Sequence, residues 1–143
     1  MNGLAFFDTN VLVYSDDTSA PLKQERAIAL FADHLRKGTA VVSLQVLQEY
    51  FAAATRKLGL NPIIAQRKVE IIARARVVCF EVSDVVAAIE LHRLTHIPFW
   101  DSLIVRAARS AGAAVLYSED LQAGGVHSSI PVVNPFLTPA PSR

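Results

Sequence analysis

The chain has 143 residues, of which 52% are hydrophobic and 19% are charged, and this composition excludes a largely disordered protein. Its length suits a single domain that buries a core of its own. The formal net charge is only +1, so an RNA partner would depend on a local basic surface around its binding site.

Short apolar runs alternate with helical patterns along the chain, which is typical of an α/β fold with a mainly parallel sheet. The expected strands lie at residues 4–7, 40–42, 77–80, 115–117 and 130–133. The expected helices span residues 22–37, 44–58, 62–75, 83–95 and 98–111. No linker or repeat interrupts this pattern, so we expect one domain over residues 1–135 and a flexible, proline-rich tail at 136–143.

The expected helix ends carry residues that commonly start or stop helices. Ser43 and Ser83 are the expected N-caps, and Gly38, Gly59 and Gly112 stand where helices should end.

The helix expected at 44–58 has apolar residues three or four positions apart, and we expect this face to pack on the sheet. The face consists of Leu44, Leu47, Phe51, Ala54 and Leu58.

Cys79 lies in an apolar run and is expected to be a buried strand thiol. Trp100 and the tyrosines are expected in the core rather than as stacking platforms for bases. A single cysteine excludes a disulfide framework, and we find neither a signal peptide nor an apolar run near the roughly 18 residues of a membrane span. We therefore expect a cytoplasmic protein.

Four acidic residues occupy positions where a parallel sheet would bring them together. Asp8 and Asp120 follow expected strands, Glu49 lies in the helix after the second strand, and Asp101 opens a helix. Ligands of open α/β sheets bind at the carboxyl ends of the strands. Four like charges gathered there would require a divalent cation. Without these four acids the chain has nine acidic residues against 14 Lys and Arg, a positive balance that permits an RNA substrate.

Each of these acids also has a structural explanation when it is taken alone. Asp8 is a suitable N-cap for a turn that follows it. Glu49 would fit a solvated helix face, and the helix dipole favours Asp101 in a first turn. Asp120 would fit a polar turn. Their joint placement is what favours a metal site.

Phosphodiester hydrolysis needs an activated water and relief of charge on the leaving oxygen, which Mg²⁺ or Mn²⁺ supplies. Mg²⁺ takes only one or two carboxylates directly. We expect Asp8 and Asp120 to be direct ligands, with Glu49 and Asp101 ligating or positioning water. The scattered histidines match no zinc site, and there is no phosphate-binding glycine loop.

Four short motifs, in order and spacing, resemble those of PIN-domain ribonucleases and, more narrowly, VapC-type toxins of bacterial toxin–antitoxin pairs. The resemblance covers the chain from Leu4 to about Pro135. The motifs are Phe7-Asp8-Thr9-Asn10, residues 43–49, Trp100-Asp101-Ser102-Leu103-Ile104 and Ser118-Glu119-Asp120-Leu121.

The resemblance implies a PIN-like three-layer fold, in which a five-stranded, mainly parallel sheet carries helices on both faces. It implies that Asp8, Glu49, Asp101 and Asp120 form the metal cluster of an Mg²⁺- or Mn²⁺-dependent endoribonuclease. It further implies a homodimer and an antitoxin partner protein. The residues expected to support the acids by hydrogen bonds are Thr9, Asn10 and Ser118.

Two other functions compete with the nuclease. A catalytically silent PIN-like module would bind RNA or protein without cutting, and it would be expected to lack one or more of the four acids. A phosphatase with an aspartyl nucleophile would need a second acid two residues after Asp8, where this chain has Asn10.

Overall fold

The computed structural model describes residues 3–121 and 130–137, and in them short strands alternate with helices. The strands are β1 (Ala5–Phe7), β2 (Ala40–Ser43), β3 (Arg76–Val78), β4 (Val115–Tyr117) and β5 (Val132–Val133). The helices are α1 (Thr9–Tyr14), α2 (Pro21–Lys37), α3 (Leu44–Arg56), α4 (Pro62–Ile72), α5 (Val82–Thr95) and α6 (Phe99–Ser110). Helix α1 was expected only as a turn.

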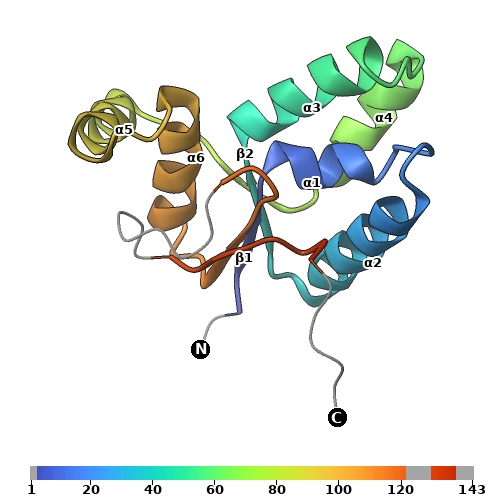
Figure 1. Cartoon of the computed structure of the whole chain (residues 1–143), viewed down its shortest axis with the longest axis horizontal. Coiled ribbons are helices and arrows are strands. Elements are labelled where there is room, and N and C mark those ends of the chain that lie inside the picture. Colours follow the sequence, from blue (N-terminus) through green and yellow to red (C-terminus); the bar gives the residue numbers. More distant parts are fainter. Residues whose placement is uncertain (1–2, 122–129, 138–143) are drawn as a thin grey trace.

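The five strands form one sheet in the order β3-β2-β1-β4-β5, and every neighbouring pair is parallel. Helices α5 and α6 lie on one side of the sheet and α1 to α4 lie on the other (Figure 1). This arrangement confirms the predicted three-layer α/β fold. None of the helices in the described ranges combines the length and hydropathy that a membrane span requires.

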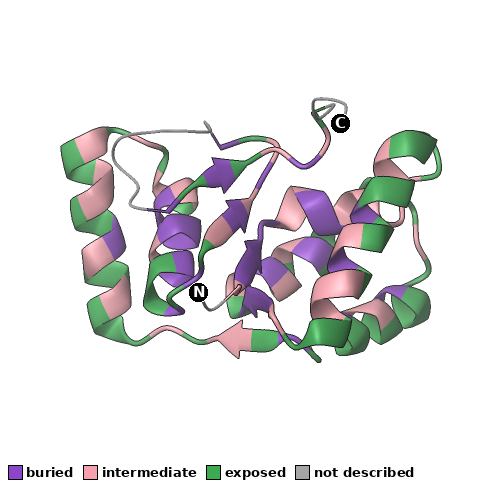
Figure 2. Cartoon of the chain, turned by 90° about the horizontal axis from the view of Figure 1, so that it is seen from below, coloured by how far each residue is buried: buried purple, intermediate pink, exposed green. Residues whose placement is uncertain are grey.

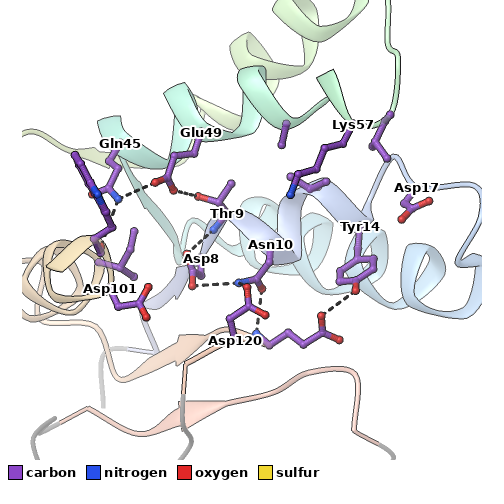
Figure 3. A pocket seen from close by; sticks show the side chains of 16 residues that line it. Asp8, Thr9, Asn10, Tyr14, Asp17, Gln45, Glu49, Lys57, Asp101 and Asp120 are labelled. Carbon is purple, nitrogen blue, oxygen red and sulfur yellow. Dashed lines mark hydrogen bonds between the residues drawn. The ribbon is translucent and has the colours of Figure 1, made fainter. Parts of the chain in front are cut away.

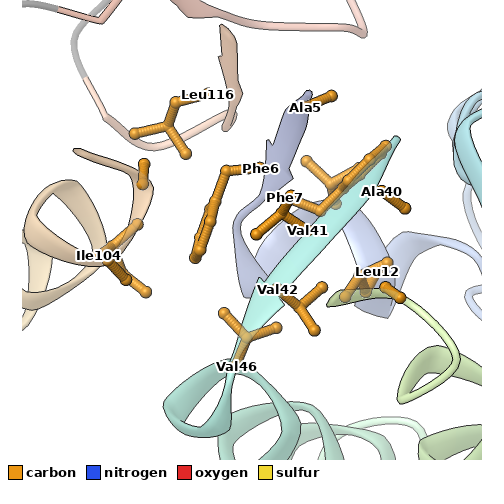
Figure 4. Packing of buried hydrophobic residues seen from close by; sticks show 14 of the residues in the cluster. Ala5, Phe6, Phe7, Leu12, Ala40, Val41, Val42, Val46, Ile104 and Leu116 are labelled. Atoms are coloured by element: carbon orange, nitrogen blue, oxygen red, sulfur yellow. The ribbon is translucent and has the colours of Figure 1, made fainter. Parts of the chain in front are cut away.

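The central strands are short apolar runs because helices cover the sheet on both sides. Every residue of β1 and β2 is buried, and Figure 2 shows the buried positions concentrated in the middle of the molecule. Successive side chains of β1 point to opposite faces. Phe6 lies toward Ile104 of α6 (Figure 4), whereas the Phe7 ring packs edge-on against Phe31 of α2 at 5.0 Å between centroids.

Local hydrogen bonds explain where the helices begin and end. The Ser43 hydroxyl accepts a bond from the backbone N–H of Val46 at 3.3 Å, which confirms Ser43 as the N-cap of α3. Gly38 ends α2 with a φ of 74°, a left-handed conformation that glycine adopts without strain. The prediction for Ser83 was wrong, because α5 begins at Val82 and is capped by Glu81.

Predictions of burial were wrong at Leu44, Phe51 and Cys79. The predicted α3 face is confirmed at Ala54, which is buried, and at Leu47, which packs against the core, but Leu44 and Phe51 are exposed. Val46 and Tyr50, which were not predicted as part of this face, are the other buried residues of α3. Both faces of α3 are apolar, so spacing alone could not choose between them. Cys79 is exposed because β3 ends one residue earlier, at Val78, on the edge of the sheet.

Buried polar contacts fix the segment that follows α1. The hydroxyl of the fully buried Tyr50 donates to Asp16, and the other oxygen of Asp16 pairs with Lys68 of α4 at 2.8 Å. Burial, together with the bond to this carboxylate, raises the pKa of the Tyr50 hydroxyl. The end of α1 is thereby connected to both α3 and α4.

The order of the strands singles out one position along the carboxyl edge of the sheet. The chain moves outward from β1 through β2 to β3, then returns to the other side of β1 to add β4 and β5. The carboxyl ends of β1 and β4 therefore flank the point where the winding direction changes, which is where open α/β sheets bind ligands.

Of the expected tail at 136–143, Phe136 packs on Tyr14 at 4.9 Å between ring centroids, and residues 138–143 lie outside the described residues.

Candidate functional site

Asp8 lies at the carboxyl end of β1 and also caps α1. One carboxylate oxygen accepts from the backbone N–H of Thr9 at 2.7 Å, and the other accepts from the Ser118 hydroxyl at 2.8 Å. Only 7% of Asp8 is exposed. The N-cap prediction is therefore confirmed, and the same side chain lines a pocket at this edge of the sheet.

Glu49 reaches the same region from the middle of α3. The Thr9 hydroxyl donates to one of its carboxylate oxygens at 2.6 Å, and the Gln45 amide donates to the other at 3.0 Å. These bonds hold the carboxylate toward α1 (Figure 3). A freely solvated helix face, the alternative explanation, does not describe this arrangement.

Asp120 is joined to Asp8 through a single amide. Asn10 Nδ2 lies 3.2 Å from Asp8 Oδ2 and 3.3 Å from Asp120 Oδ2, while Asn10 Oδ1 accepts from the backbone N–H of Glu119 at 3.0 Å. The buried Ser118 hydroxyl also accepts from the backbone N–H of the residue that follows Asp120, at 3.1 Å. The turn after β4 is therefore held by the residues that hold Asp8.

Asp101 lies in the first turn of α6 and is half-buried. Burial raises the pKa of its carboxyl, and the negative charges of Asp120 and Glu49 raise it further. Burial likewise raises the pKa of Asp8 to about 6, although hydrogen bonds from Ser118 and Thr9 oppose the change. The acids are near enough for each other's charge to matter, and without a counterion they destabilise one another's ionised forms.

All four predicted acids line one pocket of about 530 Å³ at this edge of the sheet. The predicted supporting residues Thr9 and Asn10 line it as well, and Figure 3 shows them between Glu49 and Asp120. The structure thus brings together residues that are up to 112 positions apart, as 8 and 120 are. The proximity of these acids is therefore a product of the tertiary fold.

The oxygen-rich donor set fits Mg²⁺ or Mn²⁺, which prefer carboxylate, carbonyl and water ligands. No three acidic, histidine or cysteine side chains within residues 3–121 and 130–137 are grouped so that they could hold one ion by themselves. Mg²⁺ commonly takes one or two protein carboxylates and keeps several waters. One oxygen of Asp8 and one oxygen of Asp120 lie 3.2 Å and 3.3 Å from the same Asn10 amide nitrogen.

The pocket also contains residues that were not predicted as part of the site. Gln45 precedes Glu49 by one helical turn, and this spacing of four residues could have identified it. Lys57 lies two turns beyond Glu49 and also lines the pocket. Trp100 was expected in the core, but it is 63% exposed at the pocket wall, so that prediction was wrong.

A second polar network borders the pocket. The Tyr14 hydroxyl donates to Glu119 at 2.8 Å, and Lys23 forms an ion pair with the same carboxylate. The Lys23 ammonium also lies 4.7 Å from the centre of the Tyr14 ring. Glu119 is therefore directed toward α1 and α2 and has its own counterion, whereas no ion pair within residues 3–121 and 130–137 involves any of the four candidate acids.

Comparison with known proteins gives one family match. The PIN domain family model matches residues 5–124, a range that contains all four acids. A comparison with curated proteins gives no match.

Solved structures with the same fold include three from bacterial toxin–antitoxin systems. A toxin–antitoxin complex from Klebsiella pneumoniae has a TM-score of 0.65 at 17% identity, covering 92% of this chain and 98% of that one. VapC20 of Mycobacterium tuberculosis, a toxin that cleaves the sarcin–ricin loop, has a TM-score of 0.65 at 19% identity, with 81% and 89% covered. VapBC2 of Rickettsia felis, bound to a DNA fragment from its promoter, has a TM-score of 0.62 at 19% identity, with 82% and 88% covered.

Proposed function

The chain belongs to the PIN domain family, and we propose that it is a metal-dependent endoribonuclease, the toxin of a type II toxin–antitoxin pair. The observation that carries this proposal is the convergence of Asp8, Glu49, Asp101 and Asp120 on one pocket. Asp8, Glu49 and Asp120 accept hydrogen bonds from neighbouring residues of the pocket, and four acids gathered in this way are suited to a divalent cation and a phosphate-containing substrate. The folds of VapC20 and of the Klebsiella pneumoniae toxin–antitoxin complex support the toxin role.

Asp8 and Asp120 would hold Mg²⁺ or Mn²⁺, with Glu49 and Asp101 orienting its waters. The cation would lower the pKa of water and offset charge on the leaving oxygen. The protein's own contribution is orientation, because Thr9 fixes Glu49 and Asn10 fixes the turn that carries Asp120. The depth of Asp8 keeps bulk water from competing for its oxygens.

An antitoxin and a second copy of the chain are the proposed partners. Two of the structural neighbours are complexes of a toxin with its antitoxin, which supports an inhibitory partner for this chain. An apolar groove of about 480 Å³ between α3 and α4 offers a surface for a protein. The exposed α5 residues Val82, Val86 and Leu94 support self-association.

Cleavage of structured RNA by the purified chain tests the activity. We expect cleavage with Mg²⁺ or Mn²⁺ and none with EDTA, and a sarcin–ricin loop RNA is a suitable first substrate. Asp101→Asn should reduce the rate by about 10- to 100-fold. Asp33→Asn is the matched control, because Asp33 lies on α2, where it pairs with Arg36 and Lys37 outside the pocket.

RNA that is bound but left intact by the parent chain would instead identify a silent PIN-like module. Equal cleavage by the parent and Asp101→Asn would refute the assignment of the site. Arrest of bacterial growth on expression of the chain, relieved by co-expression of a candidate antitoxin, tests the toxin role. Sedimentation analysis tests the homodimer.

A further inference from the structure

One face of α3 forms a continuous wall of the pocket. Gln45, Glu49, Ala53 and Lys57 all line it, and they recur every four residues. At a rise of about 1.5 Å per residue, this wall is about 18 Å long from end to end. Glu49 and the other acids lie between its two ends, and the ends carry side chains of different chemistry.

Trp100 marks the Gln45 end of the wall. The Gln45 amide donates to the backbone oxygen of Trp100 at 3.5 Å, and Trp100 is the residue immediately before Asp101. Its ring contacts Phe99 in an edge-type arrangement at 5.2 Å between centroids, and 63% of the residue is exposed. An exposed indole beside a phosphodiester site offers a platform on which an unpaired base can stack.

Lys57 marks the other end, and Figure 3 shows it across the pocket from Asp101. It is exposed, and no ion pair involves it within the described part of the chain. Among the described residues that line the pocket it is the one cation, and a lysine ammonium in such a place suits a phosphate. The acids that line the same pocket are Asp8, Asp17, Glu49, Asp101, Glu119 and Asp120.

We propose that a single strand of RNA crosses the pocket along α3, with a base stacked on Trp100 and a phosphate held by Lys57. The scissile phosphate lies between these two contacts, over the acidic cluster. The wall accommodates no more than about five nucleotides at the stacked spacing of about 3.4 Å. A base that stacks on a side chain must be unpaired, so the substrate is a loop or a single-stranded segment rather than a duplex.

This inference rests on the proposed function for its substrate, but its test measures binding rather than cleavage. Trp100 is the only tryptophan in the chain, so intrinsic fluorescence reports on it alone. The full chain carrying Asp8→Asn, in Mg²⁺ buffer, is titrated with a five-nucleotide RNA and with an abasic oligomer of the same length. We expect saturable quenching by the RNA and little by the abasic oligomer.

Three outcomes of the titration would overturn the role of Trp100. One is equal quenching by both oligomers, and another is unchanged fluorescence while anisotropy of a labelled RNA reports binding. The third is poor quenching of the free protein by acrylamide, which would mean that a protein interface covers the indole. Trp100→Ala should weaken RNA binding about tenfold, whereas Trp100→Phe, which retains a stacking surface, should largely preserve it.

The salt dependence of affinity tests Lys57. One phosphate contact to single-stranded nucleic acid contributes about 0.7 to the slope of log K against log salt. Lys57→Ala should lower the slope by that amount and weaken binding. The matched control is Arg56→Ala, because Arg56 is an adjacent exposed cation that does not line the pocket. Equal slopes for the two variants would contradict the proposed contact.

The two proposals can fail separately. If the parent chain cuts no RNA, but Trp100 is quenched and Lys57→Ala changes the slope, the path of the strand stands and the nuclease assignment fails. If the parent chain cuts RNA and neither binding signal appears, the nuclease assignment stands and this path is wrong.

Discussion

The burial of Asp8 predicts that its charge destabilises the metal-free protein. The pKa of Asp8 rises from 3.8 to about 6, which at about 1.4 kcal/mol per pH unit corresponds to about 3 kcal/mol at pH 8. The folded state binds this proton more tightly than the unfolded chain does. Stability of the metal-free protein should therefore increase as the pH falls from above 6 toward 4.

Asp8→Asn removes this charge and keeps a side chain of the same shape. The new carbonyl can still accept from the backbone N–H of Thr9, but the new amide faces the Asn10 amide, which loses an acceptor. That loss costs about 1 kcal/mol. We therefore expect Asp8→Asn to be about 1–2 kcal/mol more stable than the parent at pH 8 in EDTA, while its cleavage activity is lost.

Urea unfolding of both proteins at pH 8 and pH 4 measures the effect. At pH 4 the parent carboxyl is protonated when folded, so the variant should lose its advantage and become slightly less stable. Added Mn²⁺ should raise the melting temperature of the parent and have little effect on the variant. A variant that is less stable than the parent at both pH values would refute the argument that Asp8 carries an uncompensated buried charge.

Three further predictions concern the support of the site and the fold. Thr9→Val should reduce kcat about tenfold without changing the melting temperature, whereas Thr9→Ser should retain activity; equal rates for both would exclude an orienting role. Phe6→Ala should lower the free energy of unfolding in urea by about 3–5 kcal/mol, and a loss below 1 kcal/mol would contradict its buried position. The backbone N–H of Glu81 and then Arg106 lower the pKa of Asp84, so this contribution to stability is present at neutral pH and is lost as the pH falls through the lowered pKa. Asp84→Asn should therefore melt below the parent at pH 7, and the difference should shrink as the pH falls below 3.8; a constant difference would argue against a role for the charge.

The order of elements and the candidate acids could be predicted because each depends on local sequence. The apolar runs of β1 and β4 are followed at once by Asp8 and by Ser118 to Asp120, and parallel strands bring such ends to one edge. Capping by Ser43 and the stop at Gly38 depend on a few neighbouring residues. These features were therefore predicted together with their positions.

The choice between two apolar faces depends on tertiary packing and could not be made from the sequence. Spacing identified an apolar stripe that includes Leu44 and Phe51, but packing selected the stripe through Val46 and Tyr50. Tryptophan is a residue type that is expected in the core, yet Trp100 lies beside Asp101 at the pocket wall. The hydrogen bond between Thr9 and Glu49 joins residues 40 positions apart, so no local sequence pattern predicts it.

Helix α1 is too short to be stable alone, and its position is set from outside, by Asp8 before its first residue and Asp16 beyond its last. Folding therefore delivers Thr9 and Asn10 already oriented, and no later rearrangement is needed to prepare them. If the chain is the nuclease proposed above, its site is assembled as soon as the chain folds. Control of the activity would then fall to the supply of the cation or to another molecule that covers the pocket.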